Sequence, residues 1–380
     1  MIRLATPSID ESDLSAVARV LESGHLVQGP EVAEFEAELA EVIGTRHVVA
    51  VNSGTSALLA TLHALGVGPG SLVPVAAYSW IATANVVSLL GGDPLFIDID
   101  PETHAIDPDQ LESALDGLTG EDLMSRVPCI VPVHPFGYVA DMDRINEIAN
   151  RHRIPVVEDA ACALGAQLDG RSAGSWGLAG CFSFHPRKII TTGEGGAVAT
   201  DDSRLAEHIR EFRNHGQSVR TSERAFVMPG DNLRMTDFQA ALGRSQLRRL
   251  DELLNARRAA MARYVERLEG TGFVPQSFDW GRTAGQSFVV TVSDTRLRDN
   301  LIAGLSERGV EAGIGTIDMP GAEHYISAWS GGHHPCPVTR DIAARSISLP
   351  LHHGMDDETV DVVVATLQRF MSRTGDQIEA

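Results

Sequence analysis

Hydrophobic and polar residues alternate along the first 250 positions with two periods, one helical and one strand-like. In the stretch 29–44, Val32, Phe35, Leu39 and Val42 recur at helical spacing while glutamates occupy the opposite face. This spacing predicts an amphipathic helix that buries one face. The same pattern predicts further helices at 56–66 and 141–153.

Short apolar runs lie between these helices, and each is of the length expected for a buried strand. The runs are residues 47–51, 94–99, 128–133, 155–159 and 181–184. Apolar strands that alternate with helices indicate a mostly parallel sheet covered on both faces. The predicted fold class is therefore α/β, with a mostly parallel central sheet between layers of helices.

A long helical stretch over residues 234–270 separates this pattern from the rest of the chain. Beyond it, the periodicity predicts one strand and two helices, at 287–292, 297–309 and 357–373. A chain of 380 residues is too long for one ordinary core. We expect a large domain over 1–250, with an N-terminal helical segment, and a smaller C-terminal α/β domain over 251–380.

Composition and charge narrow the classes of protein that this fold could represent. The chain is 43% apolar and 22% charged, which is typical of a globular protein, and its net charge of −20 argues against a nucleic-acid or anionic-membrane partner. It shows no signal-peptide pattern and no apolar run near the ~20 residues of a membrane helix. Its four cysteines are far apart, so we expect reduced thiols and a cytoplasmic location.

The distribution of basic residues singles out one position. Of 31 lysines and arginines, 30 are arginine, and the single lysine is Lys188 in "CFSFHPRKIITTGEGG". Arginine cannot replace lysine as a nucleophilic amine, because guanidinium keeps its proton at any ordinary pH. Lys188 follows a predicted strand and precedes a glycine-rich turn, where parallel sheets bind ligands. A chance surface lysine is the alternative interpretation.

A lysine that forms a Schiff base suggests pyridoxal phosphate, whose phosphate needs backbone N–H groups at a helix start. The stretch "VNSGTSALLATL" supplies a strand, a loop and then a helix. Gly54 permits close approach of a phosphate, and Thr55 and Ser56 add hydroxyls. Without other evidence, such a loop can equally be an ordinary N-terminal helix cap.

Two further residues have the chemistry that the cofactor ring requires. Asp159 ends the apolar run "PVVED" and could keep the pyridine nitrogen protonated, so that the ring acts as an electron sink. Trp80 in "AYSWIAT" could cover the ring face. The alternatives are a surface carboxylate at a strand end and a tryptophan of the core.

With these elements in this order, the chain resembles the DegT-type nucleotide-sugar aminotransferases, which are fold type I enzymes dependent on pyridoxal phosphate. The resemblance covers nearly the whole chain and includes "VNSGTSALLATLHALGVGPG", "YSWIATANVV", "VVEDAACALGA", "CFSFHPRKIITTGEGGAVAT" and "GDNLRMTDFQAA". It implies a three-layer, aspartate-aminotransferase-like fold. It also implies an enzyme that moves an amino group from glutamate or glutamine to a keto-sugar, in particular a nucleotide-linked keto-deoxyhexose.

The resemblance also assigns roles to individual residues. It implies that Lys188 binds pyridoxal phosphate covalently and that Asp159 pairs with the ring nitrogen. Trp80 matches a ring-stacking aromatic residue. The residues that match phosphate contacts are Thr55, Ser56 and Ser183. Asn232 matches an asparagine that reaches the phosphate from the neighbouring subunit, which implies a homodimer with shared active sites.

Three positions depart from the pattern of the family. Cys162 stands where glutamine or histidine is usual near the cofactor ring, which puts that contact in doubt. Asp231 replaces a common aromatic residue before the asparagine, and His25 replaces a frequent tryptophan. All three are expected near the cofactor or the substrate, so they leave the choice of donor and acceptor open.

Several rival interpretations of the function remain. The acceptor could be a keto-cyclitol, or the protein could be a related sugar dehydratase, although relatives of that kind lack the lysine found here at Lys188. A non-catalytic regulatory protein of the same fold would be expected to lose Lys188, Asp159 or the Ser-Gly-Thr loop, and all are present.

A metal site is not expected. The candidate ligands are His333, His334, Cys336, His352 and His353. Adjacent histidines point apart on a strand, and no second pair has the spacing of a zinc site.

Overall fold

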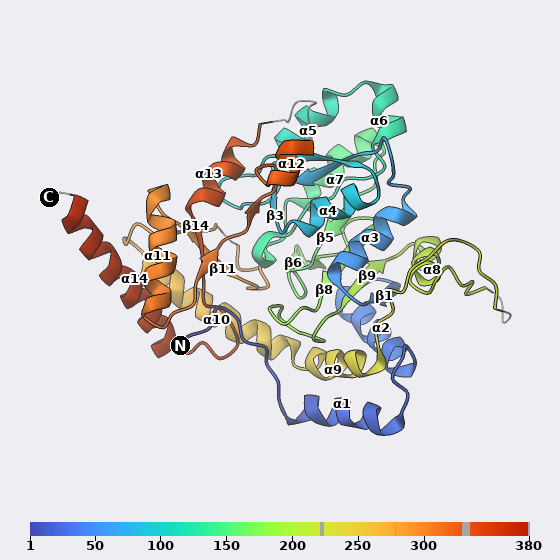
Figure 1. The fold of residues 1–380 in the computed structure, drawn as a ribbon, viewed down its shortest axis with the longest axis horizontal. Helices are drawn as coiled ribbons and strands as arrows, with labels where there is room; N and C mark the ends of the chain where they lie inside the picture. Colours follow the sequence, from blue (N-terminus) through green and yellow to red (C-terminus); the bar gives the residue numbers. More distant parts are fainter. Residues whose placement is uncertain (221–223, 278, 329–334, 379–380) are drawn as a thin grey trace.

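The computed structural model describes residues 1–220, 224–277, 279–328 and 335–378. A central sheet with helices on both sides fills the larger part of the molecule, and the C-terminal elements form a second body beside it (Figure 1). The strands of the central sheet are β1 (His47–Val51), β2 (Leu72–Ala76), β4 (Asp93–Ile97), β5 (Val157–Asp159), β8 (Ala179–Ser183) and β9 (Gly196–Thr200).

The pairing of these strands confirms the mostly parallel sheet. One part has the order β1-β9-β8-β5, in which β5 and β8 are parallel and β9 is antiparallel to both of its neighbours. Parallel bridges from Ile130, Val131 and Val133 connect β5 to β2, which pairs in parallel with β4. The α/β class predicted from the sequence is therefore the one observed.

Two apolar cores lie against the two faces of this sheet. Val48 and Ala50 of β1 belong to one core, whereas Val49 and Val51 belong to the other, as the alternation of a strand requires. The helices of this part are α2 (Pro30–Ile43), α3 (Gly54–Ala64), α4 (Ala82–Leu89), α5 (Pro108–Asp116), α6 (Gly120–Arg126), α7 (Met142–His152), α8 (Ser203–Phe212) and α9 (Asp237–Leu247).

The helices predicted from the sequence are observed, with two corrections. In α2, Ile43 is buried at 3% exposure and Val42 is 38% exposed, because the position four residues after Leu39 continues the buried stripe. The long helical stretch is broken into α9 and α10 (Leu250–Leu268). At the break, the Arg249 guanidinium donates to the Asp13 carboxylate at 2.7 Å, a contact that periodicity does not reveal.

The C-terminal body has a core of its own, built on a four-stranded antiparallel sheet of order β10-β11-β14-β12. Its elements are α10, β10 (Val274–Pro275), β11 (Phe288–Thr291), α11 (Thr295–Glu307), β12 (Gly313–Ile314), β14 (Ser346–Leu349) and α14 (Asp357–Ile378). The N-terminus reaches this body, since the Ile2 N–H donates to the Gly309 carbonyl at 2.7 Å. The division at residue 250 stays a prediction.

The remaining elements connect the two bodies or lie at their edges. They are α1 (Glu11–Ser23), β3 (Tyr78–Ser79), a 3-10 helix (Pro135–Gly137), β6 (Gln167–Leu168), β7 (Arg171–Ser172), β13 (Ile317–Asp318), α12 (Glu323–Ala328) and α13 (Pro337–Arg345). The chain returns to the central body when β13 pairs with β3. None of the helices within the described residues is long and apolar enough to cross a bilayer.

Candidate active site

The carboxyl ends of β1, β5 and β8 meet at one edge of the central sheet, because these three strands run in the same direction. Ser53 follows β1, Asp159 ends β5, and Ser183 ends β8. Lys188 comes five residues after Ser183. The topology thus gathers the residues that the sequence singled out at the edge where open α/β sheets bind ligands.

The loop after β1 forms the start of α3. The Ser53 side chain accepts from the Ser56 N–H at 3.1 Å and caps the helix, and the Ser56 hydroxyl donates to the Asn52 side-chain oxygen at 2.6 Å. Ser53 therefore fills the capping role, while Thr55 is exposed. The helix start presents N–H groups and hydroxyls of the kind that bind a phosphate.

Gly54 is required by its contact with β8. A Cβ atom at this position would lie 2.7 Å from the Ser183 Cβ, closer than Cβ atoms normally approach. The absence of a side chain therefore lets the start of α3 pack against the end of β8. This contact brings Gly54 and Ser183 together at the start of α3, and we call these two residues the Gly54 cradle.

Asp159 is buried rather than lying at a surface strand end, with 5% of its surface exposed. One carboxylate oxygen accepts from the Thr83 hydroxyl at 2.7 Å, and the other accepts from the Ala161 N–H at 3.2 Å. Two donors fix the orientation of this carboxylate. The arrangement suits a group that must hold a positively charged partner in a defined place.

Trp80 is not a core residue, because 67% of its surface is exposed. Trp80 lies just before α4, and its carbonyl accepts from the Thr83 N–H in the first turn of that helix at 3.2 Å. Thr83 thus connects the tryptophan to the carboxylate of Asp159. An exposed indole at this place is available to cover an aromatic ring, and that role stays a prediction.

Lys188 and Cys162 are in direct contact. The Lys188 Nζ donates to the Cys162 Sγ at 3.0 Å, and both residues are half-buried. They line a small pocket together with Ser183 and Gln286. Through Ser183 this pocket adjoins the Gly54 cradle, so the amine and the helix start share one site.

Gln286 was not singled out by the sequence, and it comes from the C-terminal body. It is 6% exposed, its Nε2 donates to the Arg187 carbonyl at 2.6 Å, and its Oε1 is buried with no partner in the described residues. Arg257 holds the backbone here, donating to the Gln286 carbonyl at 3.2 Å. Burial lowers the pKa of Arg257 to about 10. No local pattern marks Gln286, because the residues that it meets at the pocket lie about a hundred or more positions away.

Glu158, which precedes Asp159, is fully buried and has a structural role. Its carboxylate accepts from the His134 Nε2 at 2.9 Å and from the backbone N–H of Gly174 at 2.7 Å. It also accepts from the N–H groups of Trp176 and Gly177, at 2.6 and 2.7 Å. Consecutive strand residues face opposite sides of a sheet, so the two carboxylates have separate surroundings.

Asn232 is exposed near the end of β1, where its carbonyl accepts from the Asn52 Nδ2 at 3.3 Å. The neighbouring Asp231 is also exposed, and its carboxylate accepts from the Asn232 N–H at 2.7 Å. His25 is exposed in the turn that joins α1 to α2. The contribution of Asn232 to a partner's site stays a prediction.

The candidate metal ligands are dispersed. His333 and His334 lie outside the described residues. Cys336 is buried, with its thiol 3.8 Å from the Phe96 carbonyl, and the rings of His352 and His353 are 6.0 Å apart. Within the described residues, no group of three or more histidine, cysteine or acidic side chains could hold a metal ion.

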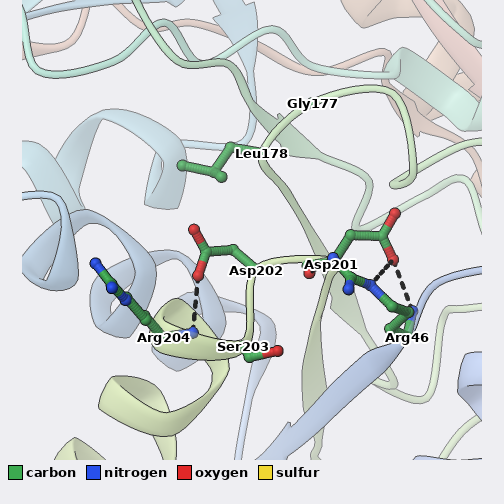
Figure 2. A pocket seen from close by; sticks show the side chains of 7 residues that line it. All are labelled: Arg46, Gly177, Leu178, Asp201, Asp202, Ser203 and Arg204. Carbon is green, nitrogen blue, oxygen red and sulfur yellow. Dashed lines mark hydrogen bonds and ion pairs between the residues drawn. The ribbon is translucent and has the colours of Figure 1, made fainter.

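A larger hollow of about 500 Å³ lies at the opposite edge of the sheet (Figure 2). It is lined by residues that precede β1 and β8 or follow β9, including Arg46, Leu178, Asp201, Asp202 and Arg204. The acidic side chains of this hollow accept hydrogen bonds from backbone N–H groups. Asp201 accepts from the Arg46 N–H at 2.8 Å, and Asp202 caps α8 by accepting from the Arg204 N–H at 2.8 Å (Figure 2).

The carboxyl-edge site fits pyridoxal phosphate, because a glycine packed against Ser183 at a helix start, a buried oriented carboxylate and one half-buried amine lie at the same edge of the sheet. Fold and site define a pyridoxal phosphate-dependent aminotransferase of fold type I. The chain belongs to the DegT/DnrJ/EryC1/StrS aminotransferase family, whose model matches residues 7–368. This confirms the predicted family, enzyme class and cofactor.

Solved structures of similar proteins agree with this membership. A DegT/DnrJ/EryC1/StrS aminotransferase from Brucella abortus is 32% identical, with a TM-score of 0.87 over 94% of this chain and 95% of that one. DesV from S. venezuelae, in complex with a ketimine intermediate, is 32% identical, with a TM-score of 0.86 over 96% and 98%. A candidate sugar aminotransferase from Streptococcus pneumoniae in its PMP form is 27% identical, with a TM-score of 0.93 over the full length of both chains.

Proposed function

We propose that this enzyme moves an amino group from glutamate or glutamine to the keto group of a nucleotide-linked deoxyhexose. The observation that carries the proposal is the Lys188 amine, the chain's only lysine, half-buried beside the Gly54 cradle at the edge where Asp159 ends β5. The sugar class is supported by the family and by the solved sugar aminotransferase of similar structure.

Each residue of the site has one task in this proposal. The start of α3 and Ser183 bind the phosphate through N–H and hydroxyl donors. Asp159 holds a positive charge at the ring nitrogen, and Trp80 covers the ring. Bound pyridoxal phosphate supplies an electron sink. Lys188 binds the cofactor and, as a free amine, holds and moves the proton at its Nζ as general acid and base.

A panel of acceptors tests the substrate class. The enzyme is first converted to its amine-loaded form with glutamate or glutamine, and the donor is then removed. Keto-sugar nucleotides, free keto-sugars and keto-cyclitols are added separately, and the return of an absorbance band near about 410–430 nm is recorded. A return with the nucleotide-linked keto-deoxyhexoses supports the proposal. A return only with a cyclitol or another acceptor contradicts it.

We also propose that two subunits share each site through Asn232. A phosphate in a chain of net charge −20 needs several donors, and the exposed Asn232 side chain could supply one across an interface. Lys188→Ala and Asn232→Ala chains are each expected to have little activity. If Asn232 acts in the partner's site, a mixed dimer places both lesions in one site and leaves the other intact.

The mixed-dimer result distinguishes the two possible arrangements. Recovered activity after mixing supports sharing between subunits. If mixed dimers form without recovery, Asn232 acts within its own subunit, where its backbone already contacts Asn52.

A further inference from the structure

The contact between Cys162 and Lys188 pairs two groups that are rare in this chain. Lys188 is the only lysine among 380 residues, and Cys162 is one of four cysteines. The 3.0 Å separation of Nζ and Sγ allows a bond between them with little movement of either side chain. Two side chains in contact in the lining of a pocket can react with each other once one of them is activated.

The other three thiols are protected by burial. Cys129, Cys181 and Cys336 are 0%, 1% and 8% exposed. Burial raises the pKa of Cys129 and of Cys336 to about 12, and it raises the pKa of Cys181 as well. A thiol that is buried and protonated reacts slowly with oxidants. Half-buried Cys162 is thus the thiol that a small oxidant reaches first.

A second feature of the pocket is a buried acceptor that has no hydrogen-bond partner among the described residues. Gln286 lines the pocket with Cys162 and Lys188, and it is more than nine-tenths buried, with 6% exposure. Its Oε1 has no hydrogen-bond partner in the described residues, while its Nε2 is held by the Arg187 carbonyl. This acceptor faces a pocket of about 10 Å³, about the volume that one water-sized molecule needs, so it can take an O–H donor of that size beside Cys162 and Lys188.

We propose that Cys162 and Lys188 form a reversible sulfur–nitrogen bond when the enzyme meets a peroxide. The Cys162 thiol attacks hydrogen peroxide and becomes a sulfenic acid, and one water leaves, so sulfur is oxidised by two electrons and peroxide is reduced. The Lys188 amine then attacks this sulfur and displaces the hydroxyl group as a second water. The proton lost from the ammonium goes to solvent.

The bond removes the amine that the cofactor needs. Each equivalent of peroxide yields one sulfenamide and two waters, and two equivalents of a thiol reductant restore the thiol and the amine as they form a disulfide. The pair would thus act as an oxidation-sensitive switch on cofactor binding. The modification depends on the contact itself and does not require any particular substrate.

Peptide mapping tests the proposal directly, because trypsin places the four cysteines in four different peptides. Cys162 falls in peptide 154–171, and uncleaved Lys188 begins peptide 188–204. Protein with and without bound cofactor is treated with hydrogen peroxide and digested. We expect peptides 154–171 and 188–204 to be joined, with a mass lower than their sum by two hydrogen atoms. The product should be abundant without cofactor and scarce when the cofactor occupies Lys188.

Two variants and a reductant serve as controls. Cys162→Ser should abolish the joined peptide, and Lys188→Arg should leave a sulfenic acid at Cys162 that a dimedone probe traps. A thiol reductant should reverse the link and restore cofactor uptake by the wild-type chain, measured as bound cofactor. Prior oxidation of Cys129, Cys181 or Cys336, or oxidation of Cys162 without a link to Lys188, would overturn the proposal.

Discussion

The two edges of the central sheet carry hollows of opposite character. At the amino edge the hollow is large, and its acidic groups are engaged by backbone N–H groups or by Arg46 (Figure 2). At the carboxyl edge the pocket is small, but it holds a single amine, a thiol and an unpartnered amide oxygen. Size therefore does not distinguish the candidate active site from the other hollow. The difference lies in whether charged and polar groups are already satisfied by the fold.

The comparison also shows how one sheet supports both kinds of site. Asp202 and Ser53 cap helices at opposite edges in the same way, each with a side-chain oxygen that accepts a backbone N–H. At the carboxyl edge, the ends of neighbouring strands also bring a carboxylate, Asp159 of β5, and a lysine, Lys188, which follows β8. Functional capacity comes from the convergence of several strand ends rather than from a cap alone.

Lys188→Arg should have the largest effect on turnover. A small effect would mean that the two edges of the sheet do not differ in the way described above. Arginine keeps the positive charge but lacks a nucleophilic amine, so turnover should fall by at least about a thousandfold. Borohydride reduction of the wild-type holoenzyme should label peptide 188–204, and the variant should take no label. Arg46→Gln at the amino edge is the matched control and should turn over normally. Substantial turnover by Lys188→Arg would contradict the assignment of the amine.

Asp159→Asn should have the second-largest effect on turnover, because it keeps the shape of the side chain and removes its charge. The loss of a charged partner for the ring nitrogen should cost about 3 kcal/mol, or roughly a hundredfold in kcat. Cofactor absorbance and single-turnover rates measure this effect. Asp201→Asn at the other edge should leave both unchanged. A variant of Asp159 with nearly normal rates would mean that another group holds the ring.

Thr83→Val should have a smaller effect through the same carboxylate. The variant keeps the side-chain volume and removes the hydroxyl that donates to Asp159 at 2.7 Å. A lost hydrogen bond to a charged acceptor costs about 1.5–3 kcal/mol, so kcat should fall by about tenfold or more. Thr83→Ser should recover most of the rate, because it restores the donor. Equal rates for the valine and serine variants would show that the hydroxyl has no part in orienting Asp159.

Gly54→Ala tests the cradle. The added Cβ would lie 2.7 Å from the Ser183 Cβ, so the start of α3 must shift away from β8. The dissociation constant of pyridoxal phosphate should rise by about tenfold, as expected if one phosphate contact is lost. Gly120→Ala at the start of α6 is the control, because no atom lies within 4 Å of its added Cβ. An unchanged affinity in Gly54→Ala would exclude the cradle as the phosphate site.

Asp202→Ala should have the smallest effect, on stability rather than activity. Backbone hydrogen bonds from Leu205 and Arg204 lower the pKa of Asp202 below its ordinary 3.8. The charged cap therefore stabilises the fold above that pH, and its contribution is lost as pH falls through the lowered pKa. At pH 7 the variant should lose about 1 kcal/mol of unfolding free energy with normal turnover. Denaturant titrations at pH 7 and near pH 3 should show the difference shrinking, and a constant difference would refute the charged cap.

The sequence predicted those parts of the site that depend on residue type and order. Lys188 and Gly54 follow strands and Asp159 ends one, so their convergence could be inferred from a parallel sheet. The segment 128–133 was predicted as a strand, yet it is joined only by isolated bridges. Pro132 lacks the N–H that a regular ladder requires, although its carbonyl accepts from the Asp159 N–H at 2.9 Å.

Other parts of the site depend on contacts between distant segments. Thr83 lies 76 positions from Asp159, and the hydrogen bond between them has no local signature. The sequence offers one indication of this role, because Thr83 lies three residues after Trp80 at the start of a helix. Gln286 reaches the pocket from the C-terminal body, and its contact with the Arg187 carbonyl spans 99 positions. Periodicity reports which face a residue occupies but not which distant residue it meets.

The four hydrogen bonds accepted by the buried Glu158 have a consequence for how the protein becomes an enzyme. They tie the end of β5 to His134 and to residues 174–177. Asp159 is the next residue, so its position is set by the polypeptide before any small molecule arrives. The free energy of cofactor capture then need not be used to order this strand. At this strand end, cofactor binding is therefore expected to resemble docking onto a preformed backbone rather than folding coupled to binding.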